Sequence, residues 1–205
     1  YINLLVKNGS LPAELKKNAD EIFTEGNIEL ASLVYSRYIE LILGGVNKAV
    51  SGADESRRDS LAQKRKTEGE LVSIAGKFSG GTQEARQDFN YANKVLGILK
   101  DLYGSDYIIG EDTQYLIAYN LQRAKDYASS AREYRRLADN YQGSKYLDEA
   151  EFKLGLISVY VLNEYAKGIS YFKDAAARGV SFEWTVMSLY QLGILSQYKG
   201  SFKEA

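Results

Sequence analysis

The amino-acid sequence predicts an all-α protein that contains internally repeated pairs of helices, and three observations support this prediction. Apolar residues recur at helical spacing along almost the whole chain, whereas the strict alternation typical of strands is rare. The 205 residues include one proline, where average usage of about 5% would give about ten, and this scarcity favours long helices with short connections. A pattern of small and aromatic residues also recurs every 37 or 38 residues, a period typical of helical solenoids.

The helical periodicity places the expected helices in order along the chain. Pro12 stands at the start of the first one, where its missing N–H group is harmless. Gly26, Gly104, Gly143 and Gly179 fall where helices are expected to end or turn. The expected helices cover residues 12–25, 28–43, 46–78, 82–103, 112–125, 128–140, 146–162, 166–178 and 182–198.

The composition excludes most enzyme classes. The chain has no histidine and no cysteine, so it cannot form a Ser-His-Asp or Cys-His nucleophile, a thiolate or imidazole metal site, or a disulfide. The carboxylates of Asp148, Glu149 and Glu151 lie at an expected helix start, where the helix dipole favours acidic residues. No phosphate-binding glycine loop, calcium-binding loop or nucleophile elbow is present in the sequence. We therefore expect no catalytic activity, no metal and no cofactor.

The charge balance argues against nucleic acid and membranes as partners. Lys and Arg total 26 and Asp and Glu total 27, so the net charge of -1 attracts neither phosphate backbones nor anionic lipids. Residues 54–70 hold five basic and five acidic residues and only two apolar ones, Leu61 and Ala62, so we expect this stretch to be solvent-exposed on all sides or mobile. The longest apolar stretches, 38–43 and 154–162, fall short of the roughly 18 residues that span a bilayer.

The repeat is clearest in the second half of the chain. Ala118, Gly155 and Gly193 are equivalent positions, and each follows an Ile or Leu. A turn comes next, then an aromatic residue just before the second helix of the pair, and a small residue three positions later. The aromatic residues are Tyr127, Tyr165 and Phe202, and the small ones are Ser130, Gly168 and Ala205. Small residues are needed because antiparallel helices cross within about 8–10 Å only where a side chain is tiny.

This arrangement resembles the tetratricopeptide repeat (TPR), whose pattern includes a Leu-Gly pair, a turn ending in tyrosine, an alanine and a further aromatic residue. Residues 111–205 contain two complete repeats and a truncated third, and a weaker copy spans residues 18–38. Residues 131–172 are similar to the bacterial cell-envelope branch of the family, the type of the barrel-assembly lipoprotein and the Tol-Pal coordinator. Gln142 stands where that branch has proline, and Gly168 stands where alanine is usual. The resemblance implies a right-handed α-α superhelix.

The sequence divides into three regions. Residues 1–43 are expected to form N-terminal helices with the weak TPR-like repeat, and residues 111–205 the TPR-like repeats. Residues 44–110 do not match the repeat, but they contain a heptad-spaced apolar seam from Ala85 to Tyr103. This seam predicts a long helical hairpin inserted between the repeats. A degenerate repeat with stretched helices is the alternative.

The resemblance also implies a binding surface, since the first helix of each pair lines the concave side of such a superhelix. The side chains at its positions would form an aromatic and aliphatic groove that suits an extended peptide or a helix of a partner protein. The alternative for each side chain is packing against the neighbouring repeat. The expected partner-binding residues are Tyr115, Tyr119, Phe152, Leu156, Val159, Tyr190 and Ile194, flanked by Asp112, Gln122, Glu149, Met187 and Gln197.

These features predict a non-catalytic scaffold that binds another protein, and the resemblance implies a role in bacterial envelope assembly. It also implies a periplasmic or envelope-associated location, with a cytoplasmic location as the alternative. Two other functions stay open, namely a non-catalytic helical arm of a larger cell-wall enzyme and capture of a small hydrophobic ligand in the groove. Because the chain begins at Tyr1 and ends within a repeat, we expect it to be a piece of a longer protein. An oligomer formed through the incomplete last repeat is a further alternative.

Overall fold

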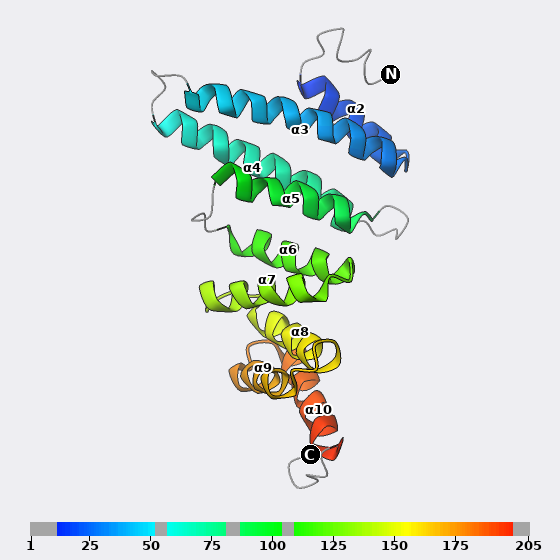
Figure 1. Cartoon of the computed structure of the whole chain (residues 1–205), viewed down its shortest axis with the longest axis vertical. Helices are drawn as coiled ribbons and strands as arrows, with labels where there is room; N and C mark the ends of the chain where they lie inside the picture. Colours follow the sequence, from blue (N-terminus) through cyan, green and yellow to red (C-terminus); the bar gives the residue numbers. More distant parts are fainter. Residues whose placement is uncertain (1–11, 52–56, 81–86, 104–108, 199–205) are drawn as a thin grey trace. The chain divides into compact units, whose positions relative to one another are not determined.

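Figure 1 shows the computed structural model of the chain, which forms two compact units. Unit 1 comprises residues 1–107 and unit 2 comprises residues 108–205. Every regular element of the described residues is an α-helix, so the all-α fold class is confirmed. None of the helices described has the combined length and apolar character that crossing a bilayer requires. The residues that the structure describes are 12–51, 57–80, 87–103 and 109–198.

The described residues of unit 1 form two pairs of helices. In the first pair, α2 and α3 are antiparallel and joined by a tight turn, where Gly26 takes a positive φ of 91° that other residues rarely adopt. In the second pair, α4 packs against α5, and α4 also contacts α2 and α3. The helices are α2 (Pro12–Thr24), α3 (Ile28–Ser51), α4 (Arg57–Gly80) and α5 (Phe89–Tyr103).

An aromatic cluster joins the four helices of unit 1. At its centre lies Phe78 on α4, whose side chain is fully buried. Its neighbours, one on each of the other helices, are Phe23 at 5.0 Å, Tyr35 at 5.8 Å and Tyr91 at 4.5 Å between ring centroids. Such tilted or edge-on contacts contribute about 0.5–1.5 kcal/mol each beyond the burial of their area. Phe78 is therefore the residue on which the packing of unit 1 most depends.

Helix α3 is longer than the sequence predicts. It continues through Gly44 and Gly45 to Ser51, whereas the expected end was residue 43. A glycine in a helix interior costs about 1 kcal/mol relative to alanine, so the Gly-Gly pair was interpreted as a break. A helix of 24 residues tolerates that cost.

The single helix expected over residues 46–78 is wrong. Its first part belongs to α3, and α4 begins only at Arg57. The expectation that residues 54–70 are solvent-exposed on all sides is also wrong, since Thr67 is only 2% exposed. The reason is that this part of α4 faces α2 and α3. The spacing of apolar residues within the stretch does not indicate this contact. The expected start of the following helix, residues 82–86, lies outside the described residues.

Residues 109–198 of unit 2 form five helices whose bounds agree with the expected ones within about two residues. Consecutive helices pack against each other, and α10 also contacts α8. The pairs are therefore α6 with α7 and α8 with α9, followed by α10. The helices are α6 (Glu111–Arg123), α7 (Tyr127–Asn140), α8 (Leu147–Tyr160), α9 (Tyr165–Arg178) and α10 (Phe182–Tyr198).

Small residues lie where the two helices of each pair cross. Between α6 and α7, Ser130 Oγ donates a hydrogen bond to the backbone oxygen of Ala118 at 2.8 Å. Between α8 and α9, a Cβ added to Gly168 would lie 3.0 Å from the backbone oxygen of Gly155 and 2.3 Å from Val159 Cγ2. The positions that the sequence pattern made equivalent therefore make the same close approach in both pairs.

The turn inside each pair of unit 2 also repeats. Lys125 and Asn163 both take a positive φ, of 65° and 57°, immediately before the second helix of their pair. This conformation is uncommon for residues other than glycine. The side chain of Asp126 then caps α7 by accepting a hydrogen bond from the backbone N–H of Ser129 at 3.1 Å. The repeat thus extends from residue type to backbone conformation.

Candidate partner-binding surface

The first helices of unit 2, which are α6, α8 and α10, are linked to one another by side-chain hydrogen bonds. Tyr115 Oη on α6 donates to Glu149 Oε1 on α8 at 2.7 Å. Tyr160 Oη on α8 donates to Gln191 Oε1 on α10 at 2.6 Å. These partners are 34 and 31 residues apart in the sequence. These hydrogen bonds connect α6 to α8 and α8 to α10, the helices that carry the expected binding residues.

Side chains from α6, α7 and α8 converge on one lysine to form a tyrosine–lysine cluster, defined as Tyr115, Tyr119, Tyr134, Glu149 and Lys153. The Nζ of Lys153 lies 2.6 Å from Glu149 Oε1 and donates to Tyr115 Oη at 3.2 Å. It also lies 4.9 to 5.7 Å from the ring centroids of the three tyrosines. Only 12% of the Lys153 side chain is exposed. The ammonium group therefore combines an ion pair with cation–π contacts in a largely desolvated place.

Two tyrosines of the cluster, Tyr115 and Tyr134, have a raised pKa. Burial raises the pKa of Tyr115, and the hydrogen bond to Glu149 and the charge of that carboxylate raise it further. Burial likewise raises the pKa of Tyr134, with additional contributions from Tyr115 and Glu149. Both phenols stay protonated at neutral pH and donate hydrogen bonds. The cluster therefore holds side chains in place and is not suited to moving protons.

A second set of contacts fixes the polar edge of this surface. The ring of Tyr115 stacks on that of Tyr146, with centroids 4.2 Å apart and planes 12° from parallel. Tyr146 Oη donates to Asp112 Oδ1 at 2.7 Å, and Lys145 Nζ lies 2.9 Å from the same oxygen. The hydrogen bonds from Tyr146 and Lys145 lower the pKa of Asp112. Gln122, another expected edge residue, accepts a hydrogen bond from the hydroxyl of the buried Tyr134 at 2.9 Å.

Two expected binding residues are buried in the core, which corrects the sequence expectation. Phe152 is 4% exposed and Val159 is 1% exposed. Phe152 lies 5.8 Å from the ring of Phe172 on α9 and 5.3 Å from that of Trp184 on α10. Leu156 is half-buried against the same core. The reason is that α8 has neighbouring helices on both sides, so most of its side chains contact protein.

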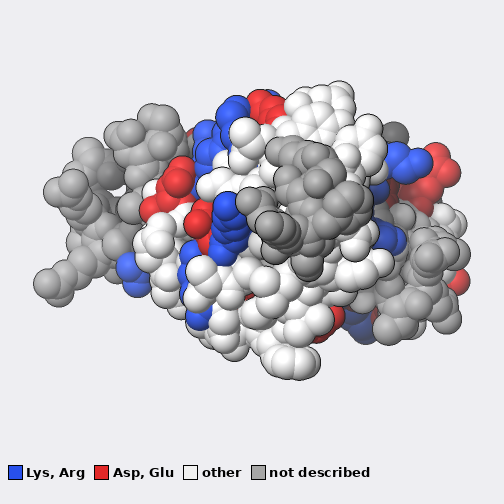
Figure 2. All heavy atoms as spheres, turned by 90° about the horizontal axis from the view of Figure 1, so that it is seen from below, with Lys and Arg blue, Asp and Glu red and all other residues white. Residues whose placement is uncertain are grey.

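An exposed apolar surface covers the outer side of α10, and we call it the α10 face. Tyr190 and Ile194, both expected binding residues, are 63% and 37% exposed there. Trp184 and Leu195, on the other side of the helix, pack into unit 2. Figure 2 views this end of the molecule and shows a broad area without charged residues. The α10 face consists of Phe182, Val186, Met187, Leu189, Tyr190, Ile194 and Tyr198.

The structure thus separates the expected binding residues into three groups. Tyr115 and Tyr119 are half-buried and meet in the tyrosine–lysine cluster, Phe152 and Val159 belong to the core, and the α10 residues are exposed. Sequence reasoning missed Phe182, Val186, Leu189 and Tyr198. The available signal was charge, because α10 contains 17 residues of which Glu183 alone is charged. A helix that is apolar on all sides is normally covered on all sides.

The carboxylates at the start of α8 have a structural role. Arg178 Nη2, at the end of α9, donates to Glu151 Oε1 at 2.8 Å, and Asp148 Oδ2 accepts from the backbone N–H of Ser181 at 2.7 Å. Burial raises the pKa of Glu151, and the hydrogen bond from Arg178 offsets part of that effect. These contacts fix the connection between α9 and α10, and so the position of the α10 face.

The chemistry that unit 2 offers is therefore that of binding. Its neutral tyrosines, its paired Lys153 and the apolar α10 face provide contact area, hydrogen-bond donors and shape. The described residues include no group of three or more acidic side chains placed to hold a metal ion. Comparisons of the chain with protein-family models, with curated proteins and with solved structures found no match.

Proposed function

We propose that the chain is a non-catalytic protein–protein interaction module whose α10 face binds an apolar helix of a partner protein. The observation that carries this proposal is a helix with apolar residues on both sides, of which only one side packs against other described residues. Exposed apolar patches that are this continuous are uncommon on surfaces that face water alone.

The spacing on α10 supports a helix as the partner. Phe182, Val186, Tyr190 and Ile194 follow one another at intervals of four residues, which forms a single ridge along the helix. Ridges of this kind pack into the grooves of a second helix, and the apolar anchors of helix-binding surfaces have this spacing. Tyr190 adds a hydroxyl for orientation at low cost in side-chain entropy.

We also propose that unit 2 is a TPR-like solenoid. The supporting observations are the paired helices, the small residues at both crossings and the contacts between first helices at separations of 31 and 34 residues. The resemblance of residues 131–172 to the envelope branch of the TPR family supports a role as a scaffold in bacterial envelope assembly. The periplasm or the envelope is the location that accords with this role.

The test uses site-specific photo-crosslinking from position 190 in cells of the source organism. The expected result is a crosslink to an apolar helical segment of one other protein, identified by mass spectrometry. A synthetic peptide of that segment should then bind the purified chain, and Tyr190→Glu should weaken binding about tenfold or more, because it places a charge in an apolar contact.

Leu33→Glu is the matched control for this test. Leu33 is 55% exposed on α3 in unit 1, so the substitution introduces the same charge on an exposed apolar site elsewhere. It should leave peptide binding unchanged, and circular dichroism should show both variants folded. Equal binding by Tyr190→Glu and the parent chain, or crosslinks only between copies of this chain, would contradict the proposal.

A further inference from the structure

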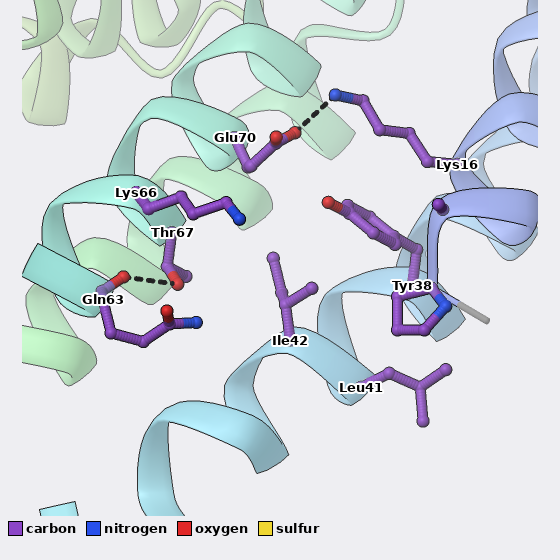
Figure 3. A pocket seen from close by; sticks show the side chains of 10 residues that line it. Lys16, Tyr38, Leu41, Ile42, Gln63, Lys66, Thr67 and Glu70 are labelled. Carbon is purple, nitrogen blue, oxygen red and sulfur yellow. Dashed lines mark hydrogen bonds and ion pairs between the residues drawn. The ribbon is translucent and has the colours of Figure 1, made fainter. Parts of the chain in front are cut away.

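Unit 1 contains a cavity of about 540 Å³ between α2, α3 and α4 (Figure 3). Its size lies within the roughly 300–1,000 Å³ range of small-molecule sites. The cavity forms beside the first turn of α2, while α3 continues past it to Ser51 and α4 starts as early as Arg57. The lining residues are Pro12, Ala13, Lys16, Tyr38, Leu41, Ile42, Gln63, Lys66, Thr67 and Glu70.

The cavity has one apolar and one polar wall. The apolar wall comes from the first turn of α2 and from α3, and includes Leu41, Ile42 and the ring of Tyr38 (Figure 3). The polar wall comes from α4, where Thr67 Oγ1 donates to the backbone oxygen of Gln63 at 3.0 Å. A ligand that fills the cavity therefore needs an apolar body with a polar group at one side.

The charged groups of the lining define that polar group. Lys16 Nζ pairs with Glu70 Oε2 at 2.6 Å, which neutralises both. Burial and the nearby Glu70 together raise the pKa of Tyr38 to about 12, so its hydroxyl carries no charge at neutral pH. Lys66 is an exposed residue whose side chain extends toward the cavity in Figure 3, so the lining holds two lysines and one carboxylate. The lining thus carries one uncompensated positive charge.

We propose that this cavity binds an amphipathic anion, with an acyl chain against Leu41 and Ile42 and an acidic head group paired with Lys66. The carboxylate of a free fatty acid and the phosphate of a single lipid share this chemistry. Charge complementarity with Lys66 selects an anion over a cation that has the same chain. The site belongs to unit 1 alone, so it does not depend on the function proposed for the α10 face.

Laurate labelled with ¹³C at the carboxyl carbon, kept below its micelle concentration, is the probe for the whole chain. Titration should show saturable binding, and intermolecular NMR contacts should appear at the methyl groups of Leu41 and Ile42. Lys66→Glu should weaken binding about tenfold, which corresponds to the loss of one charge-assisted hydrogen bond. Dodecyltrimethylammonium, a cation with an equally long chain, should bind about tenfold more weakly than laurate.

Arg65→Glu is the matched control, because it makes the same charge change at an exposed neighbour that does not line the cavity. It should leave laurate binding unchanged. Sedimentation with phosphatidylglycerol vesicles that Lys66→Glu abolishes would identify a membrane lipid, rather than a free acid, as the source of the acyl chain. The proposal is overturned if neither laurate nor vesicles bind, if Lys66→Glu binds as tightly as Arg65→Glu, or if the methyl contacts lie on α10.

Discussion

In both units the first helix of one pair contacts the first helix of the next pair, but the contacting residues lie at different separations in the sequence. In unit 2, Tyr115 on the first helix of one pair bonds to Glu149 on the first helix of the next pair, 34 residues later. In unit 1 the corresponding contact joins Lys16 on α2 to Glu70 on α4, 54 residues later. Both contacts join the first helices of consecutive pairs although the spacing differs, and the inserted hairpin and the stretched repeat both stay predictions for residues 44–110. The longer helices of unit 1 also leave room for a cavity.

The two units also differ in what joins their pairs. Between its pairs, unit 1 relies on one aromatic hub at Phe78 and on partly exposed ion pairs, whereas unit 2 relies on a desolvated lysine. Within the pair of α8 and α9, the helices meet at glycines. This difference makes each unit sensitive to different substitutions.

The largest expected effect is that of Phe78→Ala in unit 1. Loss of a fully buried ring that contacts three other helices should destabilise unit 1 by about 3–5 kcal/mol. Trp184 is the only tryptophan of the chain and lies in unit 2, so its fluorescence follows that unit alone. In a urea titration, part of the helical circular dichroism signal should be lost at lower urea concentration than in the parent chain. The midpoint of the Trp184 fluorescence transition should stay unchanged. Equal shifts of both signals would show that the units unfold as one.

The next effect compares lysines in the two units. Lys153→Met should destabilise unit 2 by about 2 kcal/mol, since it leaves Glu149 without its cation in a place where only 20% of that side chain is exposed. Lys16→Met should cost less than about 1 kcal/mol, because the Lys16–Glu70 pair is 32% and 25% exposed. Urea unfolding measures both. A larger loss for Lys16→Met would reverse this order.

Glycines provide a pair of opposite predictions. Gly168→Ala should destabilise unit 2 by about 1–3 kcal/mol, because the new Cβ would lie 2.3 Å from Val159 Cγ2. Gly97→Ala in α5 of unit 1 meets nothing within 4 Å and should stabilise that unit by about 0.5–1 kcal/mol. Thermal unfolding should move the two midpoints in opposite directions, and a gain in stability for Gly168→Ala would refute the close crossing.

The smallest expected effect is the acid sensitivity of unit 1. Burial alone would raise the pKa of Asp20, but hydrogen bonds from Lys77 and Tyr35 outweigh it, so the pKa is lowered from 3.8. The ionised carboxylate therefore stabilises the folded state above pH 3.8, and this contribution is lost as the pH falls through the lowered value. Asp20→Asn should remove this part of the loss between pH 5 and 2, as measured by urea midpoints. An unchanged pH slope would contradict the assignment.

The sequence was sufficient for the helices and their pairing in unit 2, because apolar periodicity and the small residues at the crossings are local signals. It was insufficient at Gly44 and Gly45, where the cost of two glycines is outweighed within a long helix. It was also insufficient at Phe152 and Val159, since α8 and α10 are both largely apolar and their burial differs only in the number of neighbours. The tyrosine–lysine cluster forms where side chains of three helices meet, and the sequence does not show which helices meet. Its only local signal is the spacing of four residues between Glu149 and Lys153.

Because the turns at Lys125 and Asn163 are similar, a whole helix pair can be removed from the chain or added to it. A cut after each of them removes residues 126–163 and joins Lys125 to the residue that follows Asn163, so a residue with a similar positive φ again precedes the second helix of the pair. The shortened chain would pair α6 with α9, and Ala118 would then meet Gly168 in place of Ser130. Lengthening follows the same rule, because a copy of the segment inserted after Asn163 begins and ends in the conformation that its neighbours already have.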